Sequence, residues 1–401
     1  MDTKNICSIR NMRNYFLGCI TIFLITFAAV EMDYQNLPDF ILHGEWAAGM
    51  DIGHLENFLV SVPYPIWHIG VKILYSLLGF RLDMAAAIMT AGMNVFAFWA
   101  ACLVWNYLST VKVPVSDKVF WCICLFIMGP LYVPCHNDLY YLGQGTGNTW
   151  HNPTNIAVKG FAILGFALLV YLLDSEVIWK EQIKWYCILS IILCLSAMAK
   201  PSFLQGIIPG IILLFGCRMV FKGVKSINKN IVGIILAFLP PILVVLVQFM
   251  LAFLVETPIH DGDGIGIEFG RVLKQWTPNL FISFLLAFAF PLWVLLFNVK
   301  NLIKETSIQL VVCYEICSYM ESLLLYEKGE RELVGNWCWG SYISMFIVWM
   351  CMLIKYFEIL SCKEDSRTRR ITLIGGGILL FLQVLCGSIY WFCFASGQMM
   401  Y

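Results

Sequence analysis

The sequence predicts an all-α membrane protein, a polytopic transmembrane helical bundle in a single integral domain over residues 1–401. Hydrophobic residues make up 60% of the chain and charged residues 13%, and the mean hydropathy is +0.77. Soluble domains average about 25% charged residues. The 26 basic and 26 acidic residues cancel, so we expect neither a nucleic-acid partner nor a disordered chain. Cysteines within apolar runs are expected to act as small hydrophobic residues.

Apolar segments of about 20 residues, the length that crosses a bilayer as a helix, recur along the chain. The first has a basic start but no small-residue cleavage site, so we expect an uncleaved first helix. We expect about 11–13 spans in all. The candidate segments are residues 14–30, 62–80, 84–108, 119–133, 156–173, 185–199, 202–217, 231–254, 281–298, 306–325, 337–354 and 371–394.

Charge orients these spans. Residues 218–229 carry four basic residues and no acid, which is typical of a cytoplasmic loop. Residues 31–61 carry six acids and neither Lys nor Arg, and we expect them outside together with residues 134–155. Alternating twelve spans does not satisfy both assignments. Residues 62–80, with Pro63 and Pro65, are therefore expected to form an interfacial or re-entrant segment rather than a full span.

The first outer loop holds the first candidates for chemistry. Glu31 and Asp33 follow the first apolar run, where partial desolvation would make a carboxylate more basic or a metal ligand. Residues 39–50 mix apolar and polar positions in a way that suits a short helix lying at the interface. The alternative is that these acids only mark the outer edge of the membrane.

The order of these features resembles the opening of the GT-C glycosyltransferases, a superfamily that includes protein O-mannosyltransferases and the aminoarabinose transferase of lipid A. The shared features are an acid after the first helix, an interfacial helix ending near residues 44–46 (Gly-Glu-Trp), a Pro-Tyr-Pro start at residues 63–65 and a Leu-Leu-Gly-Phe-Arg segment at 77–81. The resemblance covers residues 14–175, the GT-C-like core. Residues 176–401 share with the family only many spans joined by outer loops.

The resemblance implies an inverting transfer of sugar from a polyprenyl phosphate to a glycan or lipid acceptor. The first-loop carboxylate would be the general base or a metal ligand, and Asp33 matches it by position with Glu31 beside it. This chain reads Glu-Met-Asp, whereas relatives commonly have two adjacent acids. A second acid often occurs in the next outer loop, where Asp138 stands. Mg²⁺ or Mn²⁺ at Asp33 and Asp138 is the candidate metal, and no other cofactor is expected.

The second outer loop, residues 134–155, is rich in amides, hydroxyls, glycine and aromatic rings. Such groups suit sugar hydroxyls and stacking on a pyranose ring, although turn formers alone would also give a polar loop. With His54 of the first loop, we expect these residues to bind substrate: Asp138, Asn148, Trp150, His151 and Asn152.

Two basic residues are candidates for binding the lipid phosphate. Lys200 lies between two short apolar segments, where a cation is costly unless it is paired or reaches the interface. Arg331 precedes an aromatic, amide-rich return to the membrane, and arginine suits bidentate phosphate binding. Glu315 and Glu321, inside a predicted span, are the best indication of an ion pathway.

Together these features predict a membrane glycosyltransferase acting at the outer face of the cell membrane. Its expected partners are a polyprenyl-phosphate sugar, a glycan or lipid acceptor and membrane lipids. A polysaccharide polymerase that joins lipid-linked repeat units is the first alternative. A flippase or transporter for lipid-linked sugars is the second, and it predicts charged residues in the middle of the spans.

Overall fold

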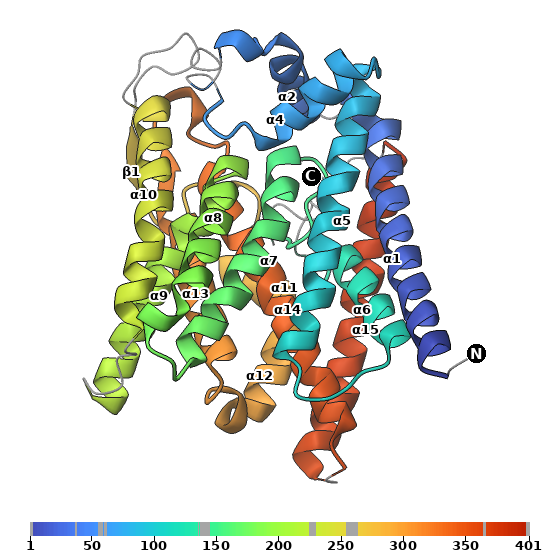
Figure 1. Cartoon of the computed structure of the whole chain (residues 1–401), viewed down its shortest axis with the longest axis vertical. Helices are drawn as coiled ribbons and strands as arrows, with labels where there is room; N and C mark the ends of the chain where they lie inside the picture. Colours follow the sequence, from blue (N-terminus) through green and yellow to red (C-terminus); the bar gives the residue numbers. More distant parts are fainter. Residues whose placement is uncertain are drawn as a thin grey trace.

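The computed structural model of the chain is a bundle of long helices with one short strand pair (Figure 1). It describes residues 3–36, 38–54, 59, 62–134, 136, 145–223, 230–253, 264–363 and 366–397. Strands β1 (Ile265–Ile267) and β2 (Leu325–Glu327) pair antiparallel. The α-helices are α1 (Thr3–Asp33), α2 (Pro38–Gly49), α4 (Ile66–Lys72), α5 (Leu82–Leu108), α6 (Val115–Ile127), α7 (Pro153–Asp174), α8 (Ile183–Ala199), α9 (Ser202–Lys222), α10 (Ile231–Phe253), α11 (Leu280–Ala287), α12 (Ala289–Leu302), α13 (Thr306–Leu324), α14 (Trp339–Ser361) and α15 (Arg367–Ala395).

Eight helices in the described chain are long and apolar enough to cross a membrane. The count reaches nine if α11 and α12, which meet at a bend of 78°, form one broken span. The eight coincide with expected spans and lie in α1, α5, α7, α8, α9, α10, α14 and α15. The chain is therefore a multi-pass helical membrane protein, as its composition predicts.

Residues 62–80 form no full span, as predicted, and two other candidate segments are shorter or more polar than expected. Residues 62–80 contain only α4 and the π-helix Ile73–Leu77, because Pro63 and Pro65 restrict where the helix can start. Helix α6 has 13 residues, about 20 Å of helix against about 30 Å of hydrocarbon. Helix α13 has 19 residues but carries Glu315 and Glu321. These differences explain why the count is below the expected number of spans.

The two outer loops of the sequence analysis meet at one end of the bundle. Helix α1 begins at the lower right of Figure 1 and ends at the top, where α2 and α4 lie. Asn152, just before α7, donates a hydrogen bond to Asp39 of α2, at 2.8 Å. The described ends of residues 31–61 and 134–155 therefore share one end, which we call the α2 end. That the α2 end faces outward stays a prediction.

The short helices of the α2 end are fixed to the bundle by polar contacts. His43 Nδ1 of α2 lies 2.9 Å from His68 Nε2 of α4, and Lys72 Nζ donates to the carbonyl of Ala48, at 2.7 Å. The indole of Trp67 donates to Thr90 Oγ1 of α5, at 3.0 Å. Helices α2 and α4 thus form one layer attached to α5.

One side chain of α15, Gln383, forms hydrogen bonds with backbone groups at two helix breaks, after α6 and between α11 and α12. Gln383 Nε2 donates to the carbonyls of Gly129, after α6, and Ala287, at the end of α11, at 3.1 and 3.0 Å. Its Oε1 accepts from the backbone N–H of Phe290, at 3.0 Å. Backbone groups inside a membrane need such partners because water is absent. Gly387 lets α15 approach this closely, since a Cβ there would lie 1.9 Å from the carbonyl oxygen of Ile127.

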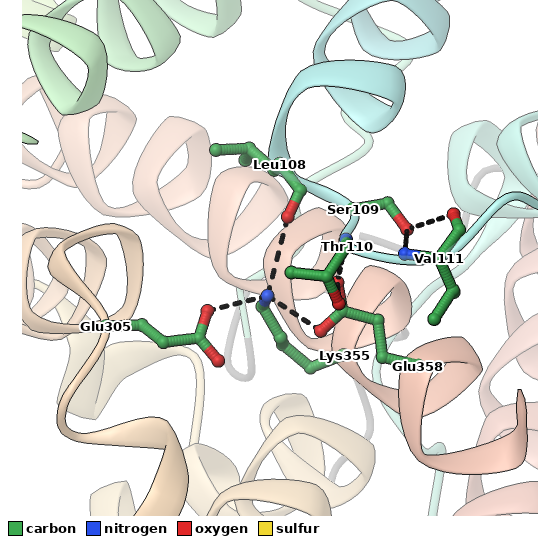
Figure 2. Close-up of polar contacts among 7 residues, drawn as sticks. All are labelled: Leu108, Ser109, Thr110, Val111, Glu305, Lys355 and Glu358. Atoms are coloured by element: carbon green, nitrogen blue, oxygen red, sulfur yellow. Dashed lines mark hydrogen bonds and ion pairs between the residues drawn. The ribbon is translucent and has the colours of Figure 1, made fainter. Parts of the chain in front are cut away.

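The end opposite α2 is joined by a buried lysine of α14 (Figure 2). Lys355 Nζ lies 2.6 Å from Glu305 Oε2 and 2.8 Å from Glu358 Oε2. Glu358 Oε1 accepts from the N–H and hydroxyl of Thr110, at 2.5 and 2.9 Å. This group, which we call the Lys355 cluster, connects α14 to the start of α13 and to the segment that follows α5.

Candidate functional site

Four helix termini converge beneath α2: the start of α7, the end of α8 and the starts of α9 and α14. Lys200 occupies the two-residue connection between α8 and α9. Pro201 follows it, so the chain leaves one helix and enters the next without a loop. This tight turn holds the lysine at the inner surface of the α2 end, where it is 8% exposed.

The ammonium group of Lys200 is held by three groups. It donates to Asn152 Oδ1, at 3.0 Å, and to Thr154 Oγ1, at 3.2 Å. It also lies 4.3 Å from the ring centroid of Trp339, the first residue of α14. Hydrogen bonds and a cation–π contact fix its position. The predicted alternative, a lysine that reaches outward to the interface, does not match this burial.

Asn152 connects the lysine to a carboxylate. It is the N-cap of α7, and its Oδ1 accepts the backbone N–H of Asn155, at 2.9 Å. Its Nδ2 donates to Asp39 Oδ2, at 2.8 Å. Capping by asparagine is strongly favoured, and Pro153 at the first helical position restrains the turn. The result is a fixed chain of Asp39, Asn152 and Lys200, which we call the Asp39–Lys200 chain.

Burial sets the protonation of this site. Desolvation lowers the pKa of Lys200 to about 7; Asp39 opposes the shift and Arg331 adds to it. Desolvation lowers the pKa of His151 to about 4, with Asp39 opposing and Lys200 adding to the shift. The imidazole is therefore neutral at neutral pH, and it packs 5.6 Å from the ring of Trp339. It can serve as a hydrogen-bonding group but not as a cation.

Two further imidazoles lie next to the Asp39–Lys200 chain. His43 is buried and within electrostatic range of Lys200, and desolvation lowers its pKa well below the usual value, with His68 and Lys200 adding to the effect. Desolvation lowers the pKa of His68 to about 3. Both rings are neutral, so their contact is a hydrogen bond in which one ring donates and the other accepts.

Arg331 borders the same region from the segment after β2. Its Nε lies 3.6 Å from Glu327 Oε2, and Asn336 donates to both oxygens of Glu327, at 3.1 Å. The phenol of Tyr64 is within electrostatic range of Arg331, Glu327 and Asp39, and desolvation raises its pKa. Arg331 is thus within electrostatic range of Lys200 while being partly neutralised by Glu327.

A second buried lysine lies deeper in α7. Lys159 Nζ donates to Asn148 Oδ1, at 2.9 Å, and lies 4.5 Å from the ring centroid of Phe346. Asn148 donates in turn to the carbonyls of Leu125 and Met128, at 2.7 and 2.8 Å. Asn148 therefore closes the end of α6 and holds Lys159. These contacts are structural, and the substrate binding expected for Asn148 stays a prediction.

Of the predicted site residues, some lie in this site, some lie elsewhere in the described chain, and one lies outside the described residues. His151, Asn152, Lys200 and Arg331 come together. Glu31 is within electrostatic range of Arg81, His54 is exposed, and the Trp150 indole is buried without a hydrogen bond in the described chain. Asp33 ends α1, and Asp138 lies outside the described residues.

The metal prediction has no support in the described part of the chain, where no group of three or more His, Cys, Asp or Glu side chains could hold an ion. Asp39, the carboxylate that does lie in the site, bonds to Asn152 near a lysine, and such surroundings do not suit a divalent cation. A pair of Asp33 and Asp138 involves a residue outside the described chain.

Sequence reasoning missed Asp39, His43, His68 and Lys159. Asp39 stands in the first turn of α2, where an acid is ordinarily explained by the helix dipole. Only the contact with Asn152, far along the chain, marks it as part of the site. Lys159 did carry a signal, since it is a lone charge within an apolar span.

No protein-family model matches this chain, and no curated protein sequence matches it. The family resemblance of residues 14–175 therefore stays a prediction, and the functional argument rests on the geometry of the α2 end.

Proposed function

We propose that this chain is an integral membrane glycosyltransferase that moves a sugar from a polyprenyl-phosphate donor to a glycan or lipid acceptor at the α2 end. The observation that carries the proposal is the Asp39–Lys200 chain. It places a carboxylate, an amide and a buried ammonium beside an indole, at one end of a bundle of apolar helices. We place the protein in the cell membrane with the α2 end outward.

The donor is the substrate that this combination suits. Its polyprenyl tail would remain among the lipids, and its phosphate needs a cation at the membrane surface. Lys200 supplies a rigidly positioned amine whose charged form a bound phosphate favours, and Arg331 supplies a second cation nearby. A sugar is bound through a flat apolar surface and through polar contacts. The ring of Trp339 offers stacking, and the amide of Asn152 offers hydrogen bonds.

The proposed step is a single displacement. The acceptor hydroxyl oxygen attacks the anomeric carbon, the bond from that carbon to the phosphate oxygen breaks, and polyprenyl phosphate leaves with the bonding electrons. The hydroxyl proton passes to a carboxylate. Asp39 suits this role because a helix and Asn152 hold it rigidly, and a base must be positioned within hydrogen-bond distance of the proton that it takes.

The decisive experiment removes the charge of each candidate base in turn and compares the variants with a control acid of the same loop. We expect Asp39→Asn to lower activity about 10²–10⁴-fold, the usual effect of losing a general base. Asp51→Asn is the matched control, because Asp51 is an exposed acid of the same loop that bonds the N–H of Gly53. The measurement is surface glycan in cells carrying each variant, normalised to its level in the membrane.

Asp33→Asn and Glu31→Gln complete the series and test the role implied by the family resemblance. Loss of activity in Asp33→Asn, with activity retained in Asp39→Asn, would move the base to the end of α1. Full activity in all three variants at normal membrane levels would exclude the glycosyltransferase mechanism.

A flippase for lipid-linked sugars is the second candidate. Lys159 and Glu315 favour it, because both are ionisable residues buried within the bundle, as a transport pathway requires. Vesicles containing the purified protein separate the two functions. A flippase moves a labelled polyprenyl-phosphate sugar to the opposite leaflet and leaves it intact, whereas a transferase releases polyprenyl phosphate.

A further inference from the structure

Glu315 is a carboxylic acid that the proposed transfer does not use. It lies near the middle of α13 and is 7% exposed. Neither of its carboxyl oxygens has a well-formed hydrogen bond within the described chain; the Ser344 hydroxyl of α14, which donates to the carbonyl of Ser341, is within interaction range. A buried acid with neither an ion pair nor a well-formed hydrogen bond in a membrane protein requires an explanation, because unsatisfied polar groups are costly there.

The surroundings of Glu315 are polar but not cationic. Helix α13 packs between α9 and α14, and Ser344 of α14 is the hydroxyl that faces the carboxyl group. The phenols of Tyr314 and Tyr319 are within electrostatic range. In the described chain Glu315 has no ion pair. Lys159 is engaged by Asn148 and Phe346, and Phe346 and Ser344 lie on nearly opposite sides of α14, about 160° apart.

An ionised carboxylate in these surroundings would lack any compensating charge. The cost of burying such an ion greatly exceeds that of burying the neutral acid, so the group takes up a proton instead. The neutral acid also has a donor, which can be shared with the hydroxyls around it. The geometry therefore favours the protonated form.

Buried serines occupy the stretch between Glu315 and the α2 end. Ser318 and Ser322 follow Glu315 at positions i+3 and i+7 of α13; the Ser318 hydroxyl lies against Gly206 of α9, and Ser341 and Ser344 lie on α14. All four are buried. We call these four serines with Glu315 the α13–α14 seam.

At the upper end of the seam lies Glu321. A Cβ on Gly340, the second residue of α14, would stand 3.6 Å from Glu321 Oε2 and 3.1 Å from the carbonyl oxygen of Ser202. Trp339, the neighbour of Gly340, carries the contact with Lys200. The seam thus reaches the same helix termini that hold the Asp39–Lys200 chain.

We propose that Glu315 is a proton-binding site, neutral in the resting protein, and that its proton exchanges with the α2 end along the α13–α14 seam and Glu321. The ligand is a proton, and the bond it forms is the O–H bond of the carboxylic acid. This inference does not depend on glycosyl transfer, since a transferase or a flippase could each contain such a site.

Infrared spectroscopy of the full-length protein in lipid vesicles tests the proposal, because a protonated carboxylic acid has a C=O stretch that a carboxylate lacks. We expect the wild-type spectrum at neutral pH to contain a band of this kind that disappears in Glu315→Gln. Glutamine keeps the size of the side chain, and its thermal unfolding profile verifies the fold. Glu31→Gln, at the end of α1, is the control and should leave the band unchanged.

Exchange into D₂O tests the route. The band should shift on transfer to D₂O, and Glu321→Gln should slow this shift without removing the band. If the wild-type protein and Glu315→Gln differ only in carboxylate bands, Glu315 is ionised and the proposal is wrong; sodium dependence of those bands would then identify a metal cation as the ligand. An unchanged exchange rate in Glu321→Gln would overturn the route.

Discussion

Lys200 combines a buried position with a charge that depends on pH. Desolvation brings its pKa to about 7, so near neutral pH the free site is divided between the ammonium and the neutral amine. An anion bound nearby favours the charged form and raises this pKa. Binding of a phosphate should therefore take up a proton wherever the free lysine is neutral.

The affinity for polyprenyl phosphate should consequently fall as the pH rises through about 7. Below this pH the lysine is already charged and binding needs no proton. Lys200→Gln should bind weakly at every pH. Calorimetric titration of the purified protein with a short-chain polyprenyl phosphate, on both sides of neutral pH, measures these affinities.

Lys200→Arg separates this effect from titration of the phosphate, which has its own pKa near 6. Arginine stays charged throughout, so the pH dependence of affinity in this variant should reflect only titration of the phosphate. A wild-type profile identical to that of Lys200→Arg would contradict the assigned role of Lys200.

Among single residues, the sequence identified those whose side chain is unusual for its place in the chain. Lys200, between two apolar segments, and Asn152, before a proline, are of this kind. Asp39 and His43 have ordinary identities for a short helix beside the membrane, and their role depends on contacts with residues elsewhere in the chain, Asn152 for Asp39 and His68 for His43. Asn148 belongs to a segment expected to be a polar outer loop, yet it is 3% exposed because it satisfies the backbone after α6.

Helix α14 organises the bundle at the scale of elements. It is buried along most of its length, it carries Trp339 at the α2 end, and it carries Lys355 at the opposite end. Lys355 is 2% exposed, and its two carboxylate partners come from different elements (Figure 2). The Lys355 cluster therefore fixes the lower end of the helix that bears the indole of the site.

Lys355→Met should destabilise the protein strongly, because it leaves two carboxylates close together without their cation. Breaking a buried pair typically costs about 3–5 kcal/mol. We expect the lower part of this range, since the side chain of Glu305 is 36% exposed and water screens it. Lys300→Met is the control, an exposed lysine of α12. The midpoint of thermal unfolding in detergent should fall for Lys355→Met and stay unchanged for Lys300→Met; equal midpoints would contradict the importance of the cluster.

Helices α5 and α7 match their expected segments within three residues, whereas α14 continues past Lys355 and Glu358 to Ser361. Helix boundaries were poorly predictable where polar contacts replaced a helix. Helix α6 stops early because the chain continues through Gly129, whose backbone bonds to Gln383 of α15. Nothing near residue 129 in the sequence indicates a partner at residue 383, so the expected span extended too far.

At the scale of the whole molecule, the two ends of the bundle differ in chemistry. The α2 end has acidic loops, imidazoles and aromatic rings around the Asp39–Lys200 chain. The opposite end carries the helix ends that border the segments in which basic residues dominate, 218–229 and 355–370. Since basic loops stay in the cytoplasm, this asymmetry predicts the orientation, and the short α4 removes the conflict that a full span at residues 62–80 would create.

Labelling single cysteines in intact cells tests this orientation, and the structure determines which positions can report it. Asn148 is buried, so a cysteine there would react slowly on either side of the membrane. Asp51, exposed after α2, and Glu181, exposed between α7 and α8 at the opposite end, are suitable in a background without the native cysteines. A membrane-impermeant maleimide should modify Asp51→Cys in intact cells and Glu181→Cys only after permeabilisation. The reverse pattern would place the Asp39–Lys200 chain on the cytoplasmic side, where a donor presented at the outer surface could not reach it, and would therefore contradict both the orientation and the proposed reaction.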